Sequence, residues 1–439
     1  MTSFPTRAAE PAPSLWQATA PAGPALPRFR GDLNTDVAIV GAGFTGLAAA
    51  RHLLRAGTGC VVLEANDVGW GASGRNAGFL VPRYKRGFAA LAAGHGPETA
   101  RRLRALLDGA IDGVEGIVAE YGIACDFRRC GQIIAAHSAR AMAGLRTEVE
   151  WLRRHAGDDG RTRLLGPDEV RAETGSPTFF GGLLDPTGAA FHPLRYVRGL
   201  AAKLAASGVP IHVGSPVTTI TETGGRVILE TPGGRVRAHR AVLATNAYTA
   251  LALRFSDLHR RIVPVATSAV ATRPLSPNLA ARVTAGGRMV SDTRRLMSWF
   301  RLLPDNRLMF GGRADLTGRR ADRPSAYAGL ERALAAAFPD LPPLEVEYRW
   351  SGMMAMTLTD FPHLGRLGDR VYYALGYGGR GVALSHRLGA DLARAARGEP
   401  VDIGPVSAGE LRPIPLHALR VPGMRLLAGY YRLRDRWWS

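Results

Sequence analysis

The chain of 439 residues is long enough for two or three domains or for one large two-lobed enzyme, and its 46% hydrophobic and 21% charged content is that of an ordinary globular protein. The formal net charge of +19 suggests a nucleic-acid-binding protein, but only Lys85 and Lys203 among the 56 basic residues are lysines, and the basic residues are scattered. A phosphate-binding surface normally uses both residue types, so the excess of arginine indicates a compositional bias. We therefore expect no nucleic-acid partner.

Cysteine content and hydropathy argue against a disulfide-rich, metal-binding, secreted or membrane-spanning protein. Cys60, Cys125 and Cys130 give an odd number without metal-ligand spacing, so we predict neither a disulfide framework nor a metal site. The N-terminus lacks the apolar core of a signal peptide, and the longest apolar run, 37–54, is interrupted by glycines and Arg51. We expect a soluble, cytoplasmic protein with no membrane partner.

The first elements in chain order form a strand–helix–strand unit. Residues 1–29, rich in Pro and Ala, are predicted to wrap over a surface without regular elements. A buried strand at 37–40 is followed by a helix over 44–56, which Gly57 ends, and by a second buried strand at 60–63. Such short connections predict a parallel strand pair.

The rest of the chain alternates between helical and β-rich segments. Residues 98–157 are predicted to be mainly helical. A helix over 193–208 precedes short strands at 211–213, 226–230, 235–238 and 241–244, with a hairpin turn at 233–234. Residues 261–313 are β-rich, 324–339 form a helix, and 370–398 form a strand, a glycine turn and a helix. This second strand–turn–helix unit predicts that distant parts of the chain complete one domain.

The turn after the first strand carries a dinucleotide-binding pattern, Gly41-Ala42-Gly43-Phe44-Thr45-Gly46. Gly41 permits the tight turn, Gly43 lets the backbone approach a pyrophosphate at the helix N-terminus, and Gly46 allows close helix–strand packing. Glu64, at the end of the next strand, is placed to accept hydrogen bonds from a ribose and to repel the 2′-phosphate of NADP. The pattern alone leaves NAD and FAD open.

The stretch 69–79, "GWGASGRNAGF", decides in favour of FAD. A flavin ring and its ribityl chain extend past the pyrophosphate and need backbone close by, which small residues allow. We predict that this surface contacts the cofactor, with Arg75 and Asn76 as donors. The predicted contacts are Ala65, Gly71, Ala72, Ser73, Arg75, Asn76 and Ala77.

With these motifs, the chain resembles the D-amino-acid-oxidase-like superfamily of FAD-dependent oxidoreductases. Within that superfamily it is similar to the gamma-glutamylputrescine oxidase-like branch. The resemblance covers nearly the whole chain. It is carried by "SLWQATA" at 14–20, "GAGFTGLAAA" at 41–50, "GWGASGRNAG" at 69–78, "FHPLRYVRGLA" at 191–201, "AVLATNAYT" at 241–249, "WFRLLPDNRLMFGGR" at 299–313, "WSGMMAMTLTDFPHLG" at 350–365 and "GYGGRGVALSHRLGADLA" at 376–393.

The resemblance implies a two-lobed α/β fold, with a Rossmann-like FAD-binding domain assembled from discontinuous segments and a mixed α+β substrate domain. We assign 30–85, 190–260 and 346–400 to the first domain, 86–189 and 261–345 to the second, and 401–439 to a C-terminal tail. It also implies that Val217 contacts the adenine and that Ala244, Thr245 and Asn246 line the dinucleotide. The turn Gly378-Gly379-Arg380-Gly381-Val382 would face the flavin, where its amides and Arg380 would stabilise negative charge.

Two departures from relatives bear on the cofactor. Arg75 stands where some relatives tether the flavin through a histidine, and no cysteine follows Cys130, so we expect non-covalent FAD. No lysine follows Lys203 to serve the reaction with oxygen, and Lys85 is read as a surface residue.

For the substrate, Trp299, Phe300, Arg301 and Tyr377 are the residues predicted to roof the flavin. Arg301 would clamp a carboxylate and the aromatic rings would hold an alkyl amine, although core packing explains Trp299 and Phe300 equally well. His192 and His363 are read as structural.

The predicted function is oxidation of the C–N bond of an amine or amino acid, related to gamma-glutamylputrescine. A hydride passes to flavin N5, the imine hydrolyses, and oxygen is the acceptor. The alternatives are a flavin dehydrogenase that passes electrons to a quinone or carrier protein, and a tRNA-modifying flavoprotein. The sequence does not determine which amine is oxidised, whether a residue acts as a general base, or the oligomeric state.

Overall fold

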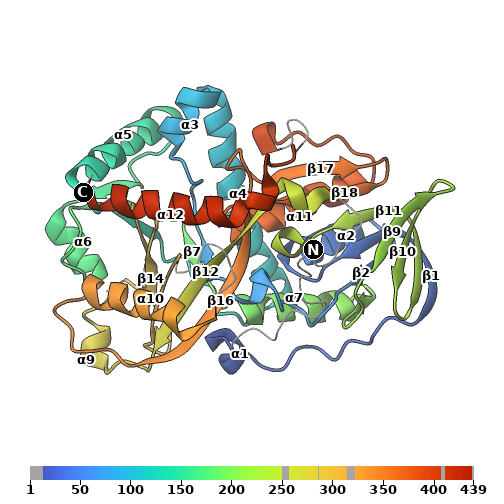
Figure 1. Cartoon of the computed structure of the whole chain (residues 1–439), viewed down its shortest axis with the longest axis horizontal. Coiled ribbons are helices and arrows are strands. Elements are labelled where there is room, and N and C mark those ends of the chain that lie inside the picture. Colours follow the sequence, from blue (N-terminus) through green and yellow to red (C-terminus); the bar gives the residue numbers. More distant parts are fainter. Residues whose placement is uncertain (1–12, 250–256, 285, 314–321, 407–410, 438–439) are drawn as a thin grey trace.

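The computed structural model describes residues 13–249, 257–284, 286–313, 322–406 and 411–437. Two eight-stranded sheets, each with its own helices, form two lobes that lie side by side (Figure 1). The predicted α/β fold, with a Rossmann-like sheet assembled from distant segments and a second mixed lobe, is confirmed.

The first sheet has the strand order β17-β18-β11-β1-β2-β8, and β10 and β9 extend from β11 as antiparallel neighbours. Its centre is parallel, since β1 pairs with β2 and β11, and β11 pairs with β18. Parallel strands are covered on both faces, which explains why 37–40 and 60–63 are apolar and buried at every position. The strands are β1 Gly31–Val40, β2 Cys60–Leu63, β8 Ile211–His212, β9 Thr219–Thr223, β10 Arg226–Thr231, β11 Gly234–Leu243, β17 His363–Leu367 and β18 Val371–Leu375.

Four helices accompany this sheet: α2 Phe44–Arg55, α4 Pro97–Tyr121, α7 Pro193–Ala206 and α11 Gly381–Ala396. Helices α2 and α11 approach closely at Gly389, where a Cβ would lie only 2.5 Å from the Thr45 carbonyl oxygen. Helices α2 and α11 each follow a glycine turn at the carboxyl end of a parallel strand, which is β1 for α2 and β18 for α11. Both turns therefore lie at the same edge of the sheet, where α/β proteins bind ligands.

The second sheet has the order β16-β12-β15-β14-β13-β4-β6-β5 and is antiparallel except between β13 and β4. Its strands are β4 Gln132–Ala135, β5 Arg163–Leu165, β6 Gly182–Asp185, β12 Val263–Thr272, β13 Met289–Asp292, β14 Trp299–Leu302, β15 Leu308–Gly312 and β16 Val346–Met356. The helices of this lobe are α3 Phe88–His95, α5 Ala139–His155, α6 Pro167–Thr174, α9 Pro277–Ala280 and α10 Pro324–Ala337. A small sheet of β3 Phe79–Leu80 and β7 Ala189–Ala190 stands apart from both.

Several predicted boundaries are wrong in detail. The strands expected at 235–238 and 241–244 are one strand, β11, because it runs alongside the full length of β1. Strand β9 was not predicted, since its residues are largely exposed and polar. Strand β4 interrupts the mainly helical 98–157. The predicted division at 346 falls at the start of β16, which pairs with β12 in the second sheet.

Both ends of the chain contain elements that were not predicted. Residues 15–19 form the short helix α1 Leu15–Thr19, which a capping box of Ser14 and Gln17 starts and which buries Trp16. Near the C-terminus, α12 Arg420–Trp437 lies across the front of the molecule in Figure 1. It packs through Ala428 and Met424 near Val265 and Met354 of the second sheet.

Within the described ranges, none of the helices has the length and apolar character needed to cross a membrane.

Candidate active site

The first glycine turn, between β1 and α2, is shaped by close backbone approach. Gly41 has a φ of +107°, a conformation that side chains rarely allow. A Cβ on Gly43 would lie 2.8 Å from Ser73 Oγ, and a Cβ on Gly46 would lie 1.9 Å from the Gly41 carbonyl oxygen. The positive φ at Gly41 and the backbone contact at Gly46 therefore require glycine, and Gly43 leaves room for the Ser73 hydroxyl.

Glu64 follows β2 and faces this turn. Its Oε2 accepts a hydrogen bond from the Ala42 amide at 2.8 Å, and its Oε1 accepts one from the Asn66 amide at 2.9 Å. Withdrawal from solvent raises the pKa of the carboxyl, while the backbone hydrogen bonds act in the opposite direction. The carboxylate oxygens have lone pairs left for ribose hydroxyls, so the predicted role of Glu64 fits this geometry.

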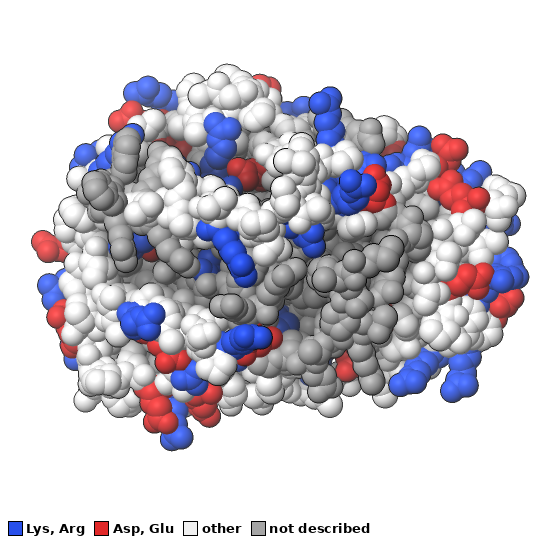
Figure 2. All heavy atoms as spheres, in the orientation of Figure 1, with Lys and Arg blue, Asp and Glu red and all other residues white. Residues whose placement is uncertain are grey.

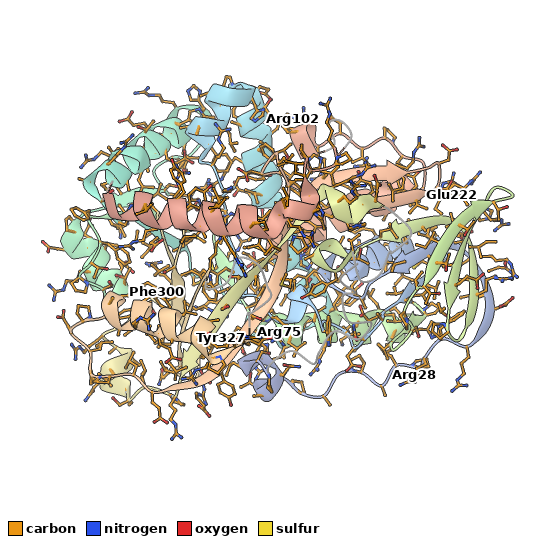
Figure 3. All side chains as sticks on the ribbon, viewed as in Figure 1. Arg28, Arg75, Arg102, Glu222, Phe300 and Tyr327 are labelled. Atoms are coloured by element: carbon orange, nitrogen blue, oxygen red, sulfur yellow. The ribbon has the colours of Figure 1, made fainter. Side chains whose placement is uncertain are left out.

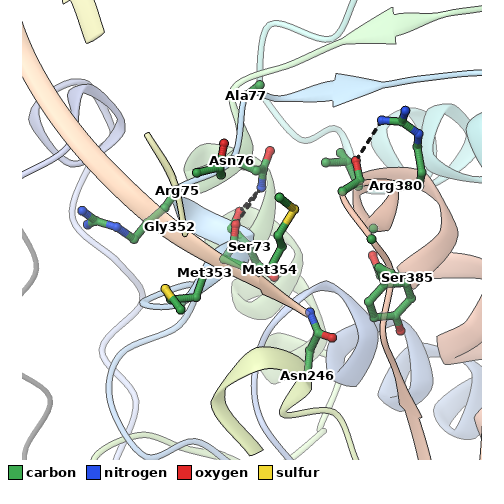
Figure 4. Close-up of a pocket in the computed structure, with 18 of the residues that line it drawn as sticks. Ser73, Arg75, Asn76, Ala77, Asn246, Gly352, Met353, Met354, Arg380 and Ser385 are labelled. Carbon is green, nitrogen blue, oxygen red and sulfur yellow. Dashed lines mark hydrogen bonds between the residues drawn. The ribbon is translucent and has the colours of Figure 1, made fainter. Parts of the chain in front are cut away.

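The stretch 69–79 forms a tight loop around a single 3-10 turn, Ala72–Gly74. Ser73 Oγ accepts a hydrogen bond from the Phe44 amide at 3.0 Å, which joins this loop to the start of α2. Asn76 Nδ2 donates to the carbonyls of Ala72 and Ser73, and Asn76 Oδ1 accepts from the Gly78 amide at 2.7 Å (Figure 4). Because its amide group is already engaged, Asn76 braces the loop, and its predicted role as a donor to the flavin is wrong for this conformation.

The Arg75 side chain also points away from the cofactor surface (Figure 4). Its Nε donates to the Ser351 carbonyl at 2.5 Å and its Nη1 to Gln17 Oε1 at 3.3 Å, while its own carbonyl accepts from Trp350 Nε1. Figure 3 shows Arg75 at the junction of the two lobes. The guanidinium thus ties the loop to α1 and β16, and the predicted donor role of Arg75 is wrong as well.

The second glycine turn lies between β18 and α11. Gly376, Gly378 and Gly379 have φ angles of +83°, +58° and +86°, and the turn delivers the chain into α11 at Gly381. Asn246 Oδ1 accepts a hydrogen bond from the Gly376 amide at 3.0 Å, and Tyr377 Oη lies 2.8 Å from Thr45 Oγ1. The Tyr377 contact holds the turn against the first dinucleotide-binding turn, and the Asn246 contact holds it against the segment that follows β11.

A single cavity of about 1050 Å³ joins these parts. This volume is at the upper end of the range for ligand pockets, about 300–1,000 Å³. Among the predicted site residues, Ala42, Gly46 and Arg301 do not line it. The predicted residues that line it are Gly41, Gly43, Phe44, Thr45, Glu64, Ala65, Gly71, Ala72, Ser73, Arg75, Asn76, Ala77, Val217, Ala244, Thr245, Asn246, Trp299, Tyr377, Gly378, Gly379, Arg380, Gly381 and Val382.

Arg301 lies behind the cavity wall. Its Nη2 donates to the Phe191 carbonyl at 2.9 Å, and its guanidinium lies over the rings of Trp16 and Phe79. Only 6% of the residue is exposed, and burial lowers its pKa to about 10. The predicted clamp of a substrate carboxylate by Arg301 is therefore contradicted, because the guanidinium is already enclosed by protein groups.

The aromatic side chains divide between wall and core. Trp299 lines the cavity and packs edge-on against Phe79, with ring centroids 5.5 Å apart. Phe300 points to the other side of β14 and packs between Phe310 and Phe338, inside the second lobe (Figure 3). Phe300 is thus a core residue, whereas Trp299 forms part of the cavity wall.

Three arginines at the cavity wall form a positive cluster, of which only Arg380 was predicted: Arg83, Arg313 and Arg380. Withdrawal from solvent, followed by the charges of Arg83 and Arg313, lowers the pKa of Arg380 to about 9. Its buried Nε has no hydrogen-bond partner among the described residues. No carboxylate of the described chain forms an ion pair with any of the three. Asp360 lies near enough for its charge to act on Arg313, but it pairs with Lys85 at 2.7 Å. Such a cluster favours an anionic ligand.

Some signal for this cluster was present in the sequence. Arg83 and Lys85 follow the flavin loop directly, and Arg313 ends the motif at 299–313. In a chain with so many arginines, only the fold distinguishes those that face the cavity. Lys85, read as a surface residue, is exposed as expected and also lines the cavity.

The histidines singled out in the sequence are structural, as expected. His192 caps the start of α7 through Nδ1, and its Nε2 lies 3.0 Å from Thr19 Oγ1. His363 Nε2 lies 2.8 Å from Thr359 Oγ1.

Comparison with known proteins gives a consistent result. Residues 36–395 match the family described as FAD dependent oxidoreductase, DAO. Gamma-glutamylputrescine oxidoreductase of Escherichia coli K12 is 34% identical over 409 residues, which cover 92% of this chain and 93% of that protein. Probable oxidoreductase OrdL of Haemophilus influenzae is 33% identical over 83% of this chain and 84% of its own. The crystal structure of glycine oxidase from Geobacillus kaustophilus superposes with a TM-score of 0.73 at 21% identity, over 86% of this chain and 99% of that one, which supports the fold.

Proposed function

The chain belongs to the DAO family of FAD-dependent oxidoreductases, enzymes that act on amines or amino acids, and from this premise we propose that it oxidises the C–N bond of an amine that also carries a carboxylate. The observation that carries the proposal is the positive cluster of Arg83, Arg313 and Arg380 on the cavity that also contains both glycine turns. A gamma-glutamylated diamine, as in the name of the Escherichia coli relative, has both groups.

The residues on the cavity fit FAD. The glycine positions of the turn at 41–46 have little room for side chains, and the helix N-terminus there favours the negative pyrophosphate. The loop 69–78 offers backbone close to the cavity. We propose that FAD is held without a covalent bond, because Arg75 occupies the place of a tethering histidine. When bound, FAD supplies the acceptor, at N5, for the hydride that leaves the substrate carbon.

The chain's own side chains would bind and orient the substrate. The arginine cluster would hold the carboxylate, and the wall of Trp299 and Phe79 would cover the alkyl chain and exclude water from the reacting carbon. The N-terminus of α11 would direct the positive end of its dipole toward the second glycine turn, which favours negative charge there.

The proposed reaction transfers two electrons from the substrate amine to the electron acceptor. The substrate loses a hydride from carbon and a proton from nitrogen, and the resulting imine adds water to give a carbonyl compound and a released amine. We propose oxygen as the electron acceptor, with hydrogen peroxide as its product. The alternative acceptor is a quinone or a carrier protein.

The test compares gamma-glutamylputrescine with putrescine, which lacks the carboxylate. Oxygen uptake and peroxide formation are measured for the FAD-loaded enzyme and for Arg313→Gln, with Arg102→Gln, an exposed arginine paired with Asp402, as the matched control. We expect a preference for gamma-glutamylputrescine, and a KM for it raised about 10-fold or more in Arg313→Gln, since a charged hydrogen bond is worth about 1.5–3 kcal/mol.

Equal effects of Arg313→Gln on both amines would contradict the role of the cluster. Turnover with an artificial dye but not with oxygen would contradict oxygen as the acceptor and leave the C–N oxidation intact.

A further inference from the structure

Residues 20–30 form a strap without regular structure that connects α1 to β1. In Figure 1 the strap runs from α1 beneath the first lobe to the start of β1. Near its start, Arg198 of α7 donates to the Pro21 carbonyl at 2.6 Å. Just past its end, the Gly31 amide donates to the Gly233 carbonyl at 2.9 Å. The strap is therefore held at both ends against the first lobe.

The middle of the strap lies beside residues 213–215, which follow β8. The carbonyl of Pro27 accepts a hydrogen bond from an amide of this segment at 3.2 Å, and the amide of Phe29 donates to the Ser215 hydroxyl at 2.8 Å. Because these two hydrogen bonds lie on either side of Arg28, they fix the position of its backbone.

The order of the neighbouring strands places the strap at one end of the cavity. The glycine turn at 41–46 follows β1, Glu64 follows β2, and β8 is the edge strand beyond β2. The strap lies along the segment that follows β8. Since neighbouring strands are about 4.8 Å apart, the strap is roughly 10 Å beyond Glu64, counted away from the glycine turn. A dinucleotide with its pyrophosphate at the turn and its ribose at Glu64 therefore extends its adenine toward the strap.

The Arg28 side chain extends over Gly214 at this end of the cavity. A Cβ on Gly214 would lie 3.1 Å from Arg28 Nε and 3.4 Å from its Cγ, so the arginine stem lies directly on the glycine. The missing side chain of Gly214 leaves the room that this stem takes. Arg28 lines the cavity together with Glu64 and Val217, the residues predicted to contact the ribose and the adenine. Figure 3 shows Arg28 at the lower edge of the first lobe.

Position rather than charge distinguishes Arg28 from the other arginines. Figure 2 shows lysine and arginine side chains scattered over the visible face, so a basic side chain at the surface is not by itself a signal in this chain. Among the described residues, the exposed Arg28 guanidinium has no ion-pair or hydrogen-bond partner, although its backbone is fixed. Guanidinium groups stack on aromatic rings, so a planar cation at this place matches the face of a purine.

We propose that Arg28 binds the adenine half of FAD, with its guanidinium on the face of the adenine ring, and that the strap thereby retains the cofactor. The family match begins at residue 36, so this contact lies outside the part of the chain that the family describes. It gives the N-terminal segment, predicted only to wrap over a surface, a direct part in binding FAD.

The experiment measures the release of FAD from the full-length holoenzyme after dilution, followed by the rise of flavin fluorescence, and the Kd of FAD on reconstitution. No amine is present, so the outcome is independent of the proposed oxidation. We expect Arg28→Ala to raise the release rate and the Kd about 5-fold or more, as for the loss of a cation stacked on an aromatic ring.

The matched control is Arg30→Ala. Arg30 is exposed on the same strap but does not line the cavity, so its removal should change neither quantity. Unchanged circular dichroism in each variant excludes misfolding as the cause of FAD release.

Two further variants separate stacking from charge. Arg28→Tyr keeps a flat surface without the charge and should retain FAD like the unchanged protein. Arg28→Lys keeps the charge without the flat surface and should release FAD like Arg28→Ala.

Three results would overturn the proposal. The first is release of FAD from Arg28→Ala at the rate of the unchanged protein, and the second is an equal effect of Arg28→Ala and Arg30→Ala. The third is any other order of the two replacements. Retention by Arg28→Lys with loss from Arg28→Tyr would assign the guanidinium to a phosphate of the cofactor instead of the adenine.

Discussion

The hydrogen bond between Thr45 and Tyr377 joins the two glycine turns, and its removal tests whether they act as one cofactor-binding unit. The two oxygens lie 2.8 Å apart and are buried, and neither has another hydrogen-bond partner among the described residues. Tyr377→Phe keeps the ring and Thr45→Val keeps the branched shape, so neither substitution opens a cavity.

The free-energy cost of each substitution follows from the burial of the two hydroxyl groups. Removing one partner leaves the other hydroxyl without a hydrogen bond, which costs about 1–3 kcal/mol. Removing both leaves no orphaned group, so the double variant should cost less than the sum of the two single variants. A coupling of about 1 kcal/mol is expected for two groups in direct contact.

The assay is the Kd of FAD for the apoprotein, measured by quenching of flavin fluorescence in the unchanged protein, both single variants and the double variant. A coupling of about 1 kcal/mol corresponds to a factor of about 5 in Kd. Additivity of the single variants within about 0.3 kcal/mol would refute the claim that this contact holds the turns together.

Three further predictions concern the turn, the cluster and acid stability. Gly46→Ala should abolish FAD binding because its Cβ would meet the Gly41 carbonyl oxygen, whereas Gly109→Ala, with open space around it on α4, should leave the flavin absorbance unchanged. Affinity for a simple carboxylate such as butyrate, followed by perturbation of the flavin spectrum, should be constant between about pH 6 and pH 8, where the carboxylate and Arg380 are both charged. It should fall as pH rises through about 9, where Arg380 loses its charge; no such fall in the unchanged enzyme would exclude Arg380 as the anion-binding group. Burial lowers the pKa of His386 from 6.5 to about 4, so the unfolded chain takes up a proton that the folded chain does not, and stability should fall as pH drops from 6.5 toward 4 by about 1.4 kcal/mol per pH unit. Chemical denaturation of His386→Asn should show a flatter pH dependence over this window, and an unchanged slope would be evidence against the assignment.

The dinucleotide-binding part of the fold was predictable because local chemistry determines it. Gly41 and Gly46 are required by steric contacts within one turn, and Glu64 by its place at the end of a buried strand. The strands 37–40 and 60–63 have the continuous apolar pattern of a doubly covered sheet.

The substrate side was less predictable because side-chain direction depends on tertiary packing. Arg301 and Arg313 belong to the same motif, yet Arg301 is enclosed by Trp16, Phe79 and a backbone carbonyl, while Arg313 lines the cavity. Arg75 is drawn away by a carbonyl on β16, a strand 276 residues later. No local pattern encodes such a choice.

The most direct test of the central claim is an anaerobic titration of the purified protein with gamma-glutamylputrescine, followed by the flavin absorbance band. We expect loss of the band at the end of the titration and a carbonyl product in an amount equal to the flavin, with putrescine requiring at least 10-fold higher concentration. A flavin band that persists with every carboxylate-bearing amine, in a protein that binds FAD, would contradict the proposed oxidation.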